Sequence, residues 1–376
     1  MADVKVTVAR DALHAALAKV ARAAPSKSKV SILQHVLLSL TPTEIVITAT
    51  DLDLELCATV PASHDHAGQS ITVIADLFSR LINDFPAGAD VVLTWSDGHK
   101  VEVKCGRSRF KVNALSPADF PSFPEIREPV RFELPATTFR RALATAASAM
   151  STEETRFYLR GVCMHIHKEA LTLVATDGVK LARDQLARPE GISEFNIIVP
   201  DRTVNDVLRL IDAKTVGDID IEAGKNQIAF RLGNIYLKSK LVDATYPDYQ
   251  RVIPRKFDHS AIVDVDELLV AVKRINMIAD RGEGESKVLR FAFNDGAVLI
   301  TTQNVEAGEA EETISVDMGD EPFSLDIGFN GAFFHSVLSA VGTETARMRL
   351  STAGDPVVFE GVGRERTDFV LMPKRV

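Results

Sequence analysis

The chain has 376 residues, 46% of them hydrophobic, and a formal net charge of −9, which predicts two or three soluble domains with their own cores. It contains no run of 18 consecutive apolar residues, and Met1 to Val8 lacks the apolar core of a signal peptide, so we expect neither a transmembrane helix nor a leader. The acidic charge argues against a simple DNA-coating protein, because non-specific affinity for DNA comes from Lys and Arg that neutralise phosphates.

Cys57, Cys105 and Cys163 are far apart and form no Cys-x-x-Cys pair. This spacing argues against a disulfide framework or a structural zinc site and fits a reducing cytoplasm.

An amphipathic helix is predicted near the start of the chain, and its pattern returns twice. Apolar residues at i, i+3, i+4 and i+7 indicate a helix with one buried face. The three apolar stripes are Leu13, Leu17 and Val20; Phe139, Ala142, Leu143, Ala146 and Met150; and Leu268, Val272, Ile275 and Ala279. The first residues of the stripes are separated by 126 and 129 residues.

A strand-like run follows each of these helices and ends near a threonine. The segments are ITATDLDLE around Thr50, LVATDGVKLA around Thr176 and LITTQNVEA around Thr302, at two equal intervals of 126 residues. A later segment, which begins at Gly106, Gly233 and Gly363, recurs at intervals of 127 and 130 residues. Because several features share one period, the chain is predicted to consist of three copies of one repeat.

Each repeat is predicted to contain a second helix, over residues 76–85, 202–212 and 331–341. The rest consists of short alternating strands, such as 44–50, separated by Gly, Pro, Asn and Asp breaks. We therefore predict an α+β fold with three tandem domains, 1–125, 126–253 and 254–376, each with two helices packed on antiparallel sheets. A closed ring of such domains would need an interface that closes, such as a head-to-tail dimer.

The same motifs, taken in order along the whole chain, resemble those of the β subunit of bacterial DNA polymerase III. They are GRSRF (106–110), ADFP (118–121), LVATDG (173–178), SKLVD (239–243), YPDY (246–249), IGFN (327–330) and the terminal MPKRV. The resemblance implies clamp-type domains in a dimeric ring whose helices line a central hole. It implies a processivity factor without catalytic residues, metal or cofactor, which encircles duplex DNA at the nucleoid in the cytoplasm.

The implied partners are duplex DNA, the α subunit of DNA polymerase III, an ATP-driven clamp loader complex, other polymerases and repair proteins, and a second copy of the chain. No membrane is implied. Counted over residues 10–23, 76–85, 137–150, 201–214, 266–281 and 331–342, the six predicted helices carry 12 Lys or Arg and 9 Asp or Glu, a net charge of +3, while the remaining residues net −12. A mildly basic lining would hold DNA by diffuse attraction, which permits sliding.

The resemblance also implies a hydrophobic pocket between the second and third repeats for a short peptide motif of the partners. Its residues are Leu159, Thr176, Gly178, Val179, Lys180, Leu181, Pro247, Arg251, Val252, Asn330, Phe333, Leu371, Met372, Pro373, Lys374, Arg375 and Val376. A few apolar anchors, a flexible Met and a polar rim suit several peptides of modest affinity. The alternative is that these are ordinary core and tail residues.

Three departures from the family pattern affect this pocket. Val179 and Lys180 stand where the family commonly has His-Arg, Phe333 where Tyr is frequent, and Lys374 where an apolar residue is common. We therefore expect the pocket to persist but its preference among partners to differ.

For DNA contacts, the resemblance points to Lys27, Arg156, Phe157 and Tyr158, and the helices add Arg22, Arg140, Arg141, Arg202 and Arg209 as candidates. Basic side chains reach phosphates and aromatic rings stack on bases, although a solvated surface charge is the alternative for each cation. The ring interface is implied at Phe110 and Val112 of one protomer and Met277 and Ile278 of the other; the alternative is burial within one protomer.

Two other hypotheses remain. Asp51, Asp53 and Glu55 alternate, and on a strand they would share one face, as in a metal-dependent nuclease; the simpler interpretation is a solvated strand face with Leu52, Leu54 and Leu56 inward. The pairs His165/His167 and His64/His66 lack a third ligand at a metal-site spacing, and GEGESK (282–287) lacks the Walker spacing. The last hypothesis is a three-domain peptide-binding protein that never meets DNA.

Overall fold

The fold is known from a computed structural model, which describes residues 3–96, 99–212, 215–280, 287–319 and 322–375. Val376 and most of the GEGESK segment lie outside the described residues. The chain divides into two compact units: the first unit contains Met1–Ala136 and Arg209–Leu241, and the second unit contains Thr137–Leu208 and Val242–Val376. Each unit is described by itself.

All three repeats follow the same order of elements within the described residues: strand, helix, four strands, helix, three strands. The first repeat contains β1 (Val4–Ala9), α1 (Arg10–Val20), β2 (His35–Leu40), β3 (Glu44–Thr50), β4 (Leu54–Pro61), β5 (Ser70–Ile74), α2 (Ala75–Asp84), β6 (Asp90–Trp95), β7 (Lys100–Cys105) and β8 (Ser108–Asn113). The second contains β9 (Val130–Pro135), α3 (Ala136–Ala147), β10 (Gly161–Ile166), β11 (Ala170–Thr176), β12 (Lys180–Ala187), β13 (Phe195–Pro200), α4 (Asp201–Leu210), β14 (Asp218–Ala223), β15 (Gln227–Leu232) and β16 (Ile235–Lys240).

The third repeat contains β17 (His259–Asp264), α5 (Val265–Ala279), β18 (Val288–Asn294), β19 (Ala297–Asn304), β20 (Gly308–Ser315), β21 (Leu325–Asn330), α6 (Gly331–Val341), β22 (Thr345–Leu350), β23 (Val357–Gly361) and β24 (Thr367–Leu371). Short 3₁₀ turns occur at η1 (Ala21–Ala23), η2 (Ser31–Gln34), η3 (Pro117–Asp119), η4 (Glu154–Leu159) and η5 (Tyr249–Arg251). The predicted α+β fold with two helices on antiparallel strands in each repeat is confirmed.

Each unit contains one eight-stranded and one four-stranded antiparallel sheet. In the first unit the orders are β5-β2-β3-β4-β16-β15-β14-β9 and β1-β6-β7-β8; in the second they are β13-β10-β11-β12-β24-β23-β22-β17 and β20-β19-β18-β21. Each eight-stranded sheet therefore combines strands from two consecutive repeats. We call the β4–β16 pairing the first joint and the β12–β24 pairing the second joint.

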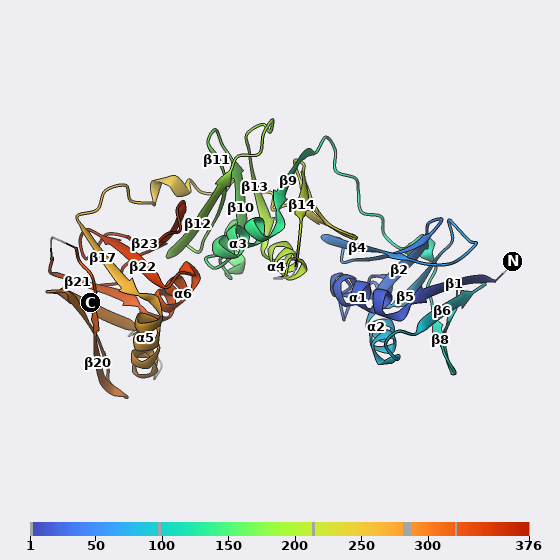
Figure 1. The fold of residues 1–376 in the computed structure, drawn as a ribbon, viewed down its shortest axis with the longest axis horizontal. Helices are drawn as coiled ribbons and strands as arrows, with labels where there is room; N and C mark the ends of the chain where they lie inside the picture. The colour runs from blue at the N-terminus through green and yellow to red at the C-terminus, as the bar shows by residue number, and fades with distance from the viewer. Residues whose placement is uncertain (1–2, 97–98, 213–214, 281–286, 320–321, 376) are drawn as a thin grey trace. The chain divides into compact units, whose positions relative to one another are not determined.

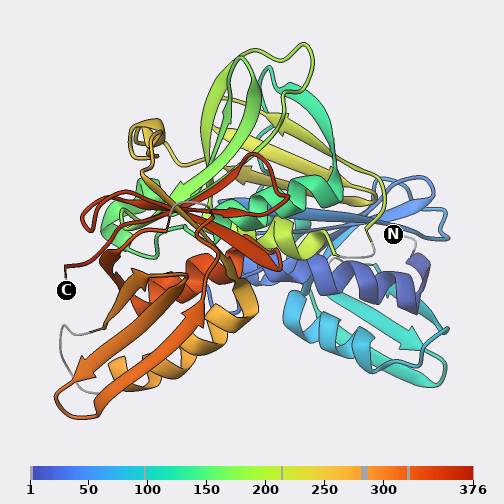
Figure 2. The ribbon, with the colours of Figure 1, turned by 60° about the vertical axis from the view of Figure 1, so that its left-hand side comes forward.

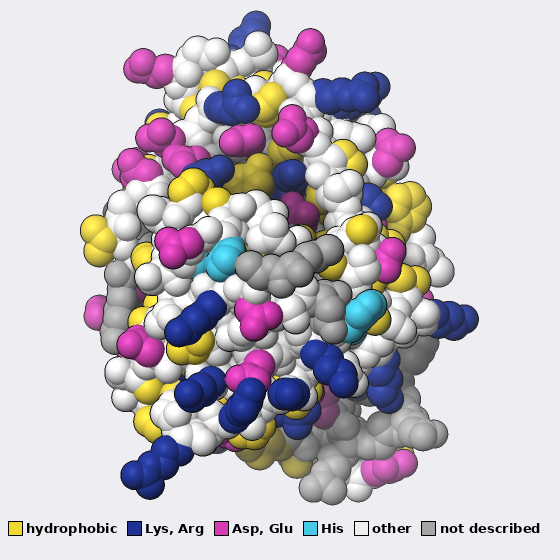
Figure 3. All heavy atoms as spheres, turned by 90° about the vertical axis from the view of Figure 1, so that its right-hand side faces the viewer, with side chains coloured by type: hydrophobic (Ala, Val, Ile, Leu, Met, Phe, Trp, Pro, Cys, Tyr) yellow, Lys and Arg dark blue, Asp and Glu magenta, His cyan; other side chains and the backbone are white. Residues whose placement is uncertain are grey.

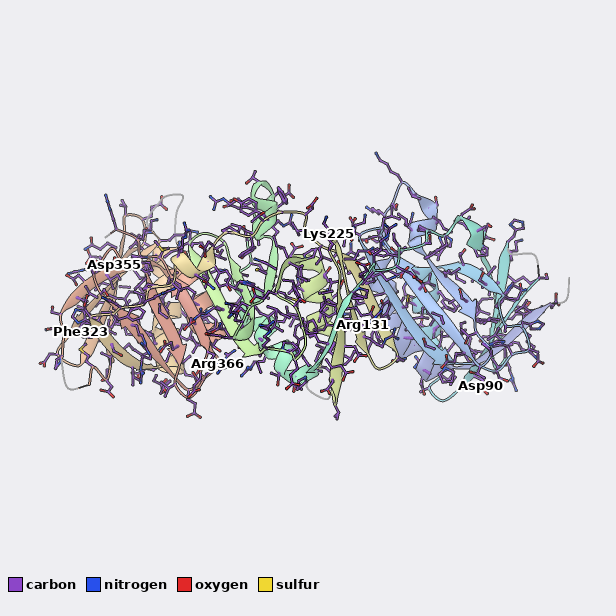
Figure 4. The ribbon with its side chains drawn as sticks, turned by 90° about the horizontal axis from the view of Figure 1, so that it is seen from above. Asp90, Arg131, Lys225, Phe323, Asp355 and Arg366 are labelled. Carbon is purple, nitrogen blue, oxygen red and sulfur yellow. The ribbon has the colours of Figure 1, made fainter. Side chains whose placement is uncertain are left out.

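Continuous backbone pairing crosses both joints. The first joint runs from Ile235↔Ala58 to Ser239↔Leu54, and the second from Lys180↔Leu371 to Asp184↔Thr367. The amide of Gln185 extends the second joint by donating to the carbonyl of Arg366, 3.1 Å away, and Arg366 is labelled in Figure 4. Because a β ladder satisfies backbone groups on both strands, each joint is part of a sheet and not a free linker.

The predicted apolar stripes form the contacts of the helices with the sheets, except that Met150 of the second stripe lies beyond the end of α3 at Ala147. Leu13, Leu17 and Val20 of α1 are buried, and α1 packs on α2, β3 and β4 in the first unit (Figure 1). In the second unit α5 packs on α6 and on strands β18, β19 and β20 (Figure 2). Each buried aliphatic side chain contributes roughly 1.5–3 kcal/mol, so these stripes hold the helices on the sheets. None of the helices in the described residues has the length and apolarity needed to cross a membrane.

One predicted strand face is wrong. Strand β4 begins at Leu54, so Asp51 and Asp53 lie in the turn after β3. The Oδ1 atom of Asp51 accepts hydrogen bonds from the amides of Asp53 (3.0 Å) and Leu54 (2.8 Å), an Asx turn that competes with strand pairing. Leu52 has a φ of 82° and is 46% exposed, so it does not point inward with Leu54. Among the described residues no group of three His, Cys, Asp or Glu side chains could hold a metal ion, which leaves the nuclease hypothesis without a site there.

Candidate functional site

The second copy of the threonine turn lies where β11 meets β12, next to the second joint. Thr176 Oγ1 donates to the carbonyl of Lys180 (2.7 Å) and accepts from the amide of Gly178 (3.0 Å). Asp177 Oδ1 accepts from the amides of Val179 (2.9 Å) and Lys180 (2.8 Å). These four bonds hold the predicted pocket residues Thr176 to Lys180 in one rigid turn.

Gly178 is required in this turn for two reasons. Its φ is +92°, a conformation that side chains with a Cβ rarely adopt, and a Cβ at this position would lie 2.9 Å from Nη1 of Arg156. The same Nη1 donates to the carbonyl of Asp177 (3.3 Å), while Nε of Arg156 lies 3.2 Å from Glu153. Arg156, predicted as a DNA contact, is thus an exposed side chain held against the pocket turn.

Lys180, which stands where the family commonly has arginine, does not extend into solvent. Its side chain is nearly buried, and Nζ donates to the carbonyl of Ser148 at 2.8 Å and lies 3.3 Å from Asp177 Oδ2. The amine therefore fixes the turn to the segment that follows α3. Val179, which is 38% exposed, carries its side chain to the surface, and its carbonyl accepts from the amide of Met372 (2.9 Å).

The floor of the site is apolar. Leu181 pairs directly with Val370 across the second joint, and both belong to a buried cluster with Leu159. The cluster also contains Cys163, Val174, Ile198, Tyr246, Tyr249 and Val358. Leu159 and Leu181 are therefore core residues, as the alternative interpretation holds, and they also form the base of the surface beside the turn.

The segment 242–257, which we call the linker, forms one wall. It packs on the apolar cluster through Val242, Tyr246, Tyr249, Ile253 and Phe257. The amide of Thr176 donates to the hydroxyl of Tyr246 at 3.0 Å, which joins the linker directly to the turn.

The predicted residues Pro247, Arg251 and Val252 are all exposed on this linker. Nε of Arg251 lies 2.8 Å from Asp248, and both residues line a hollow of about 470 Å³. The exposed fraction of Val252 is 50%, which leaves an apolar side chain available to a partner.

The start of α6 and the chain terminus supply the remaining predicted residues. Asn330 caps α6, because its Oδ1 accepts from the amides of Ala332 (3.0 Å) and Phe333 (3.1 Å). The amide of Lys374 donates to the carbonyl of Gly328 (2.8 Å), so the tail runs beside β21. Lys374 and Arg375 also line a groove of about 1020 Å³ with residues of β18, β19 and β20.

Hydrogen bonds and packing thus join the turn, Leu159, Leu181, Leu371 and Met372 into one site. Pro247, Arg251, Val252, Asn330, Phe333 and Pro373 lie on the segments beside it. The candidate list missed Tyr246 and Tyr249, although both stand in the YPDY motif; two aromatic residues in a segment otherwise rich in polar residues and proline were the available signal.

The first joint offers an internal comparison with this site. Phe123 stands 126 residues before Tyr249, and Glu55 stands 126 residues before Leu181. Leu181 pairs with Val370 in the second joint, and at the equivalent position of the first joint Glu55 pairs with Lys238. An ion pair therefore replaces the apolar floor.

Lys238 fills the place that corresponds to the pocket. Its Nζ donates to the carbonyl of Pro124 (3.2 Å), lies 3.9 Å from Glu55, and sits 5.6 Å and 5.7 Å from the ring centres of Phe123 and Tyr236. Cation–π attraction of this kind holds the residues before β9 on the sheet. The first joint is therefore closed.

The predicted DNA contacts lie on exposed loops and helix surfaces in both units. Lys27 and Arg22 are exposed in the first unit, and Phe157 is 54% exposed with its ring edge-on to Tyr158. Arg140, Arg141, Arg202 and Arg209 are exposed on α3 and α4. Nη2 of Arg141 lies 3.7 Å from the buried Asp184, so this arginine also has a structural partner.

The predicted interface residues divide into exposed and buried ones. Phe110 is 41% and Met277 61% exposed, Ile278 is partly buried, and Val112 is buried within its own unit. Phe110 and Val112 line a cavity of about 550 Å³ between α2 and β8, together with Ile74, Leu77, Arg80, Leu81, Asp84, Lys111 and Asn113.

Three domain families of known proteins match the chain in sequence order. They are the N-terminal, central and C-terminal domains of the DNA polymerase III beta subunit, over residues 4–124, 133–248 and 250–375. The chain belongs to this family.

Full-length relatives and solved structures agree with membership of the DNA polymerase III beta subunit family. The beta sliding clamp of Caulobacter vibrioides is 33% identical over 99% of this chain and 100% of the relative, and that of Escherichia coli is 30% identical over the same shares. The sliding clamp of Bartonella birtlesii bound to griselimycin is 32% identical, with a TM-score of 0.91 over 100% of both chains. The Caulobacter crescentus clamp is 32% identical, with a TM-score of 0.90 over 99% of this chain and 100% of that one.

Proposed function

We propose that the protein is a sliding clamp, a DNA polymerase processivity factor that encircles duplex DNA and tethers polymerases and repair proteins to it. The observation that carries this function is the site at the second joint, where a rigid turn, an apolar floor and an exposed linker wall meet. An apolar cluster bordered by a few fixed polar groups suits a short peptide anchor. The chain's membership of a clamp family over its whole length supports the same function.

The proposed ring follows from a rule that the two joints share. At each joint the third of the four strands between the two helices of a repeat, β4 or β12, pairs with the last strand of the next repeat, β16 or β24. The corresponding strand of the third repeat is β20, and the last strand of the first repeat is β8. Both stand at a sheet edge in the described part of the chain. Because edge strands readily pair, β8 of one copy can pair with β20 of a second copy, which gives a head-to-tail dimer.

The side chains of these edges are complementary. Strand β8 exposes Arg109 and Lys111, whereas β20 exposes Glu309 and Glu311. Lys and Arg side chains gather on the lower part of the first-unit face in Figure 3. The exposed Met277 also matches the cavity beside β8 in character, because that cavity is lined by leucines and Phe110. These features favour the proposed contacts of Phe110, Val112, Met277 and Ile278.

We propose no chemistry for the clamp itself. Lys27, Arg22, Arg140, Arg156, Phe157, Tyr158, Arg202 and Arg209 would touch DNA loosely, and Arg141 less so because of its bond to Asp184. A loader complex would supply the energy of opening, and the clamp would act at the nucleoid in the cytoplasm. The domain boundaries after residues 125 and 253 remain a proposal, supported by the starts of β9 at Val130 and β17 at His259.

The deciding experiment compares retention on a nicked DNA circle with retention on the same DNA after linearisation, following loading by a matched loader. A clamp stays on the circle and runs off the cut ends, because its hold on DNA is topological. Loss from both DNAs at the same rate, or retention on both until salt removes the protein, would refute encirclement. The latter result is the one expected for ordinary phosphate binding.

A further inference from the structure

A pair of histidines lies beneath the linker wall of the pocket. His165 projects from β10 and His167 follows the end of this strand, and their ring centres are 5.2 Å apart. Nδ1 of His165 lies 3.0 Å from the hydroxyl of Tyr249, and the two rings meet edge to face at 6.0 Å. The ring of Tyr249 is buried in the apolar cluster of the pocket floor.

The second histidine is held by a neighbouring strand. Nε2 of His167 lies 2.9 Å from Thr172 Oγ1, which also accepts a hydrogen bond of 3.1 Å from Gln185 Nε2. The two imidazoles therefore belong to one polar network that spans β10, β11 and β12 and ends on Tyr249. This network supplies the polar interactions in a contact between the linker and the sheet that is otherwise apolar.

Tyr249 belongs to the same short turn as the exposed pocket residues. It begins η5, and the amide of Val252 donates to its carbonyl at 3.3 Å. Arg251 ends η5, and its amide donates to the carbonyl of Asp248 at 3.4 Å. A displacement of Tyr249 therefore moves Arg251 and Val252 with it.

We propose that Tyr249 is a positioning residue of the peptide pocket and that protonation of His165 releases it, so that partner peptides bind more weakly in mild acid. The inference rests on the proposed function. A neutral imidazole can accept the hydroxyl proton of Tyr249 at Nδ1. An imidazolium has a proton on both nitrogens and can only donate to the hydroxyl oxygen, so protonation reverses this bond, leaves the hydroxyl proton without His165 as its acceptor and places a charge beside the buried ring.

The charged surroundings favour the neutral form. Burial lowers the pKa of His165, His167 lowers it further, and Glu194 before β13 partly opposes both. Burial raises the pKa values of Cys163 and Tyr249, which keeps both groups protonated and neutral. Arg183 on β12 is the other charged group near Tyr249, and its Nε donates to Asp368 at 2.8 Å.

The sign of the effect follows from this lowered pKa. A docked linker holds His165 neutral, whereas a released linker exposes the ring, whose pKa returns toward about 6.5. As the pH falls below that value the released form takes up the proton first, so acid favours release and peptide affinity falls. One proton changes the affinity by no more than about tenfold per pH unit.

The test measures the affinity of a fluorescent peptide at about pH 7.5 and about pH 5.5, which bracket the titration of histidine. The peptide carries Leu and Phe anchors, blocked ends and no ionisable side chain, so its own charge is constant. We expect the wild-type affinity to fall severalfold in acid. His165→Asn keeps a hydrogen-bonding group near the place of Nδ1 but does not titrate, so it should bind like wild type at the higher pH and lose the acid effect.

Two further variants separate positioning from general stability. Tyr249→Phe keeps the buried ring and removes the hydroxyl, so it should bind more weakly at the higher pH and show little further loss in acid. His66→Asn, in a loop of the first unit, is the matched control and should keep the wild-type pH profile.

An unchanged wild-type affinity between the two pH values would overturn the inference, as would a His165→Asn variant with the full acid effect. If Tyr249→Phe fails to fold, the His165→Asn comparison decides alone. A wild-type protein that binds no such peptide at either pH would instead remove the proposed peptide function, and the inference with it.

Discussion

The turn at Gly178 allows a quantitative test of the pocket. Replacing Gly178 by Ala places a Cβ at a φ of +92°, which costs about 1–3 kcal/mol for a residue other than glycine. The new Cβ would also lie 2.9 Å from Arg156 Nη1, so the guanidinium must move away from the Asp177 carbonyl. We expect a loss of stability of that size together with a weaker hold on a partner peptide, because the turn forms one side of the pocket.

Gly88 provides a matched control in the first unit. Its φ is +73° and a Cβ there would meet no atom within 4 Å, so Gly88→Ala should lower stability by a similar amount and leave peptide affinity unchanged. Stability is measured by denaturant unfolding and affinity by fluorescence anisotropy. The double variant Gly178→Ala/Arg156→Ala lacks the close contact but keeps the backbone strain, so it separates these two effects. If Gly178→Ala binds peptide as tightly as Gly88→Ala does, the turn does not shape the pocket.

The remaining predictions concern the ring and α3. Lys111→Glu should weaken the dimer in sedimentation experiments, and adding Glu311→Lys should restore it if β8 and β20 pair; a second change that worsens the defect contradicts the pairing. Arg141→Gln should destabilise the second unit by up to about 1 kcal/mol, because it removes the more distant of two cations from the buried Asp184 and leaves Arg364 in place, 2.9 Å away. The exposed neighbour Arg140, changed to Gln, should mainly weaken DNA binding, and equal stability losses in both variants would contradict this distinction.

Much of the fold was predictable because its signals are local. Apolar spacing at Leu13, Leu17 and Val20 indicated a helix, and the equal spacing of Thr50, Thr176 and Thr302 indicated three repeats. The sharing of sheets between repeats was not predictable. Strand β16 pairs with β15 of its own repeat and also with β4 of the first repeat, and no local pattern indicates the second pairing. Strand pairing across such separations depends on tertiary packing.

The site shows the same division between local and distant effects. Family motifs located the turn at Thr176, but they did not indicate that Lys180 points inward. That direction depends on the carbonyl of Ser148, which lies 32 residues earlier in the chain. Likewise, Leu52 was expected to be buried because leucines alternate along the segment, whereas the local bonds of Asp51 form a turn instead.

Lys238 has a consequence for the valency of the ring. The two joints share their strand order and their turn, yet one has an apolar floor and the other holds an ammonium group between two aromatic rings and a carboxylate. Under the proposed function, the described part of a protomer therefore has one candidate docking place, at the second joint, although its internal repetition would allow a second. If the protein acts as the proposed clamp, polymerases and repair proteins would compete for that place, and an exchange between them on DNA would require one to leave or to move to the other protomer.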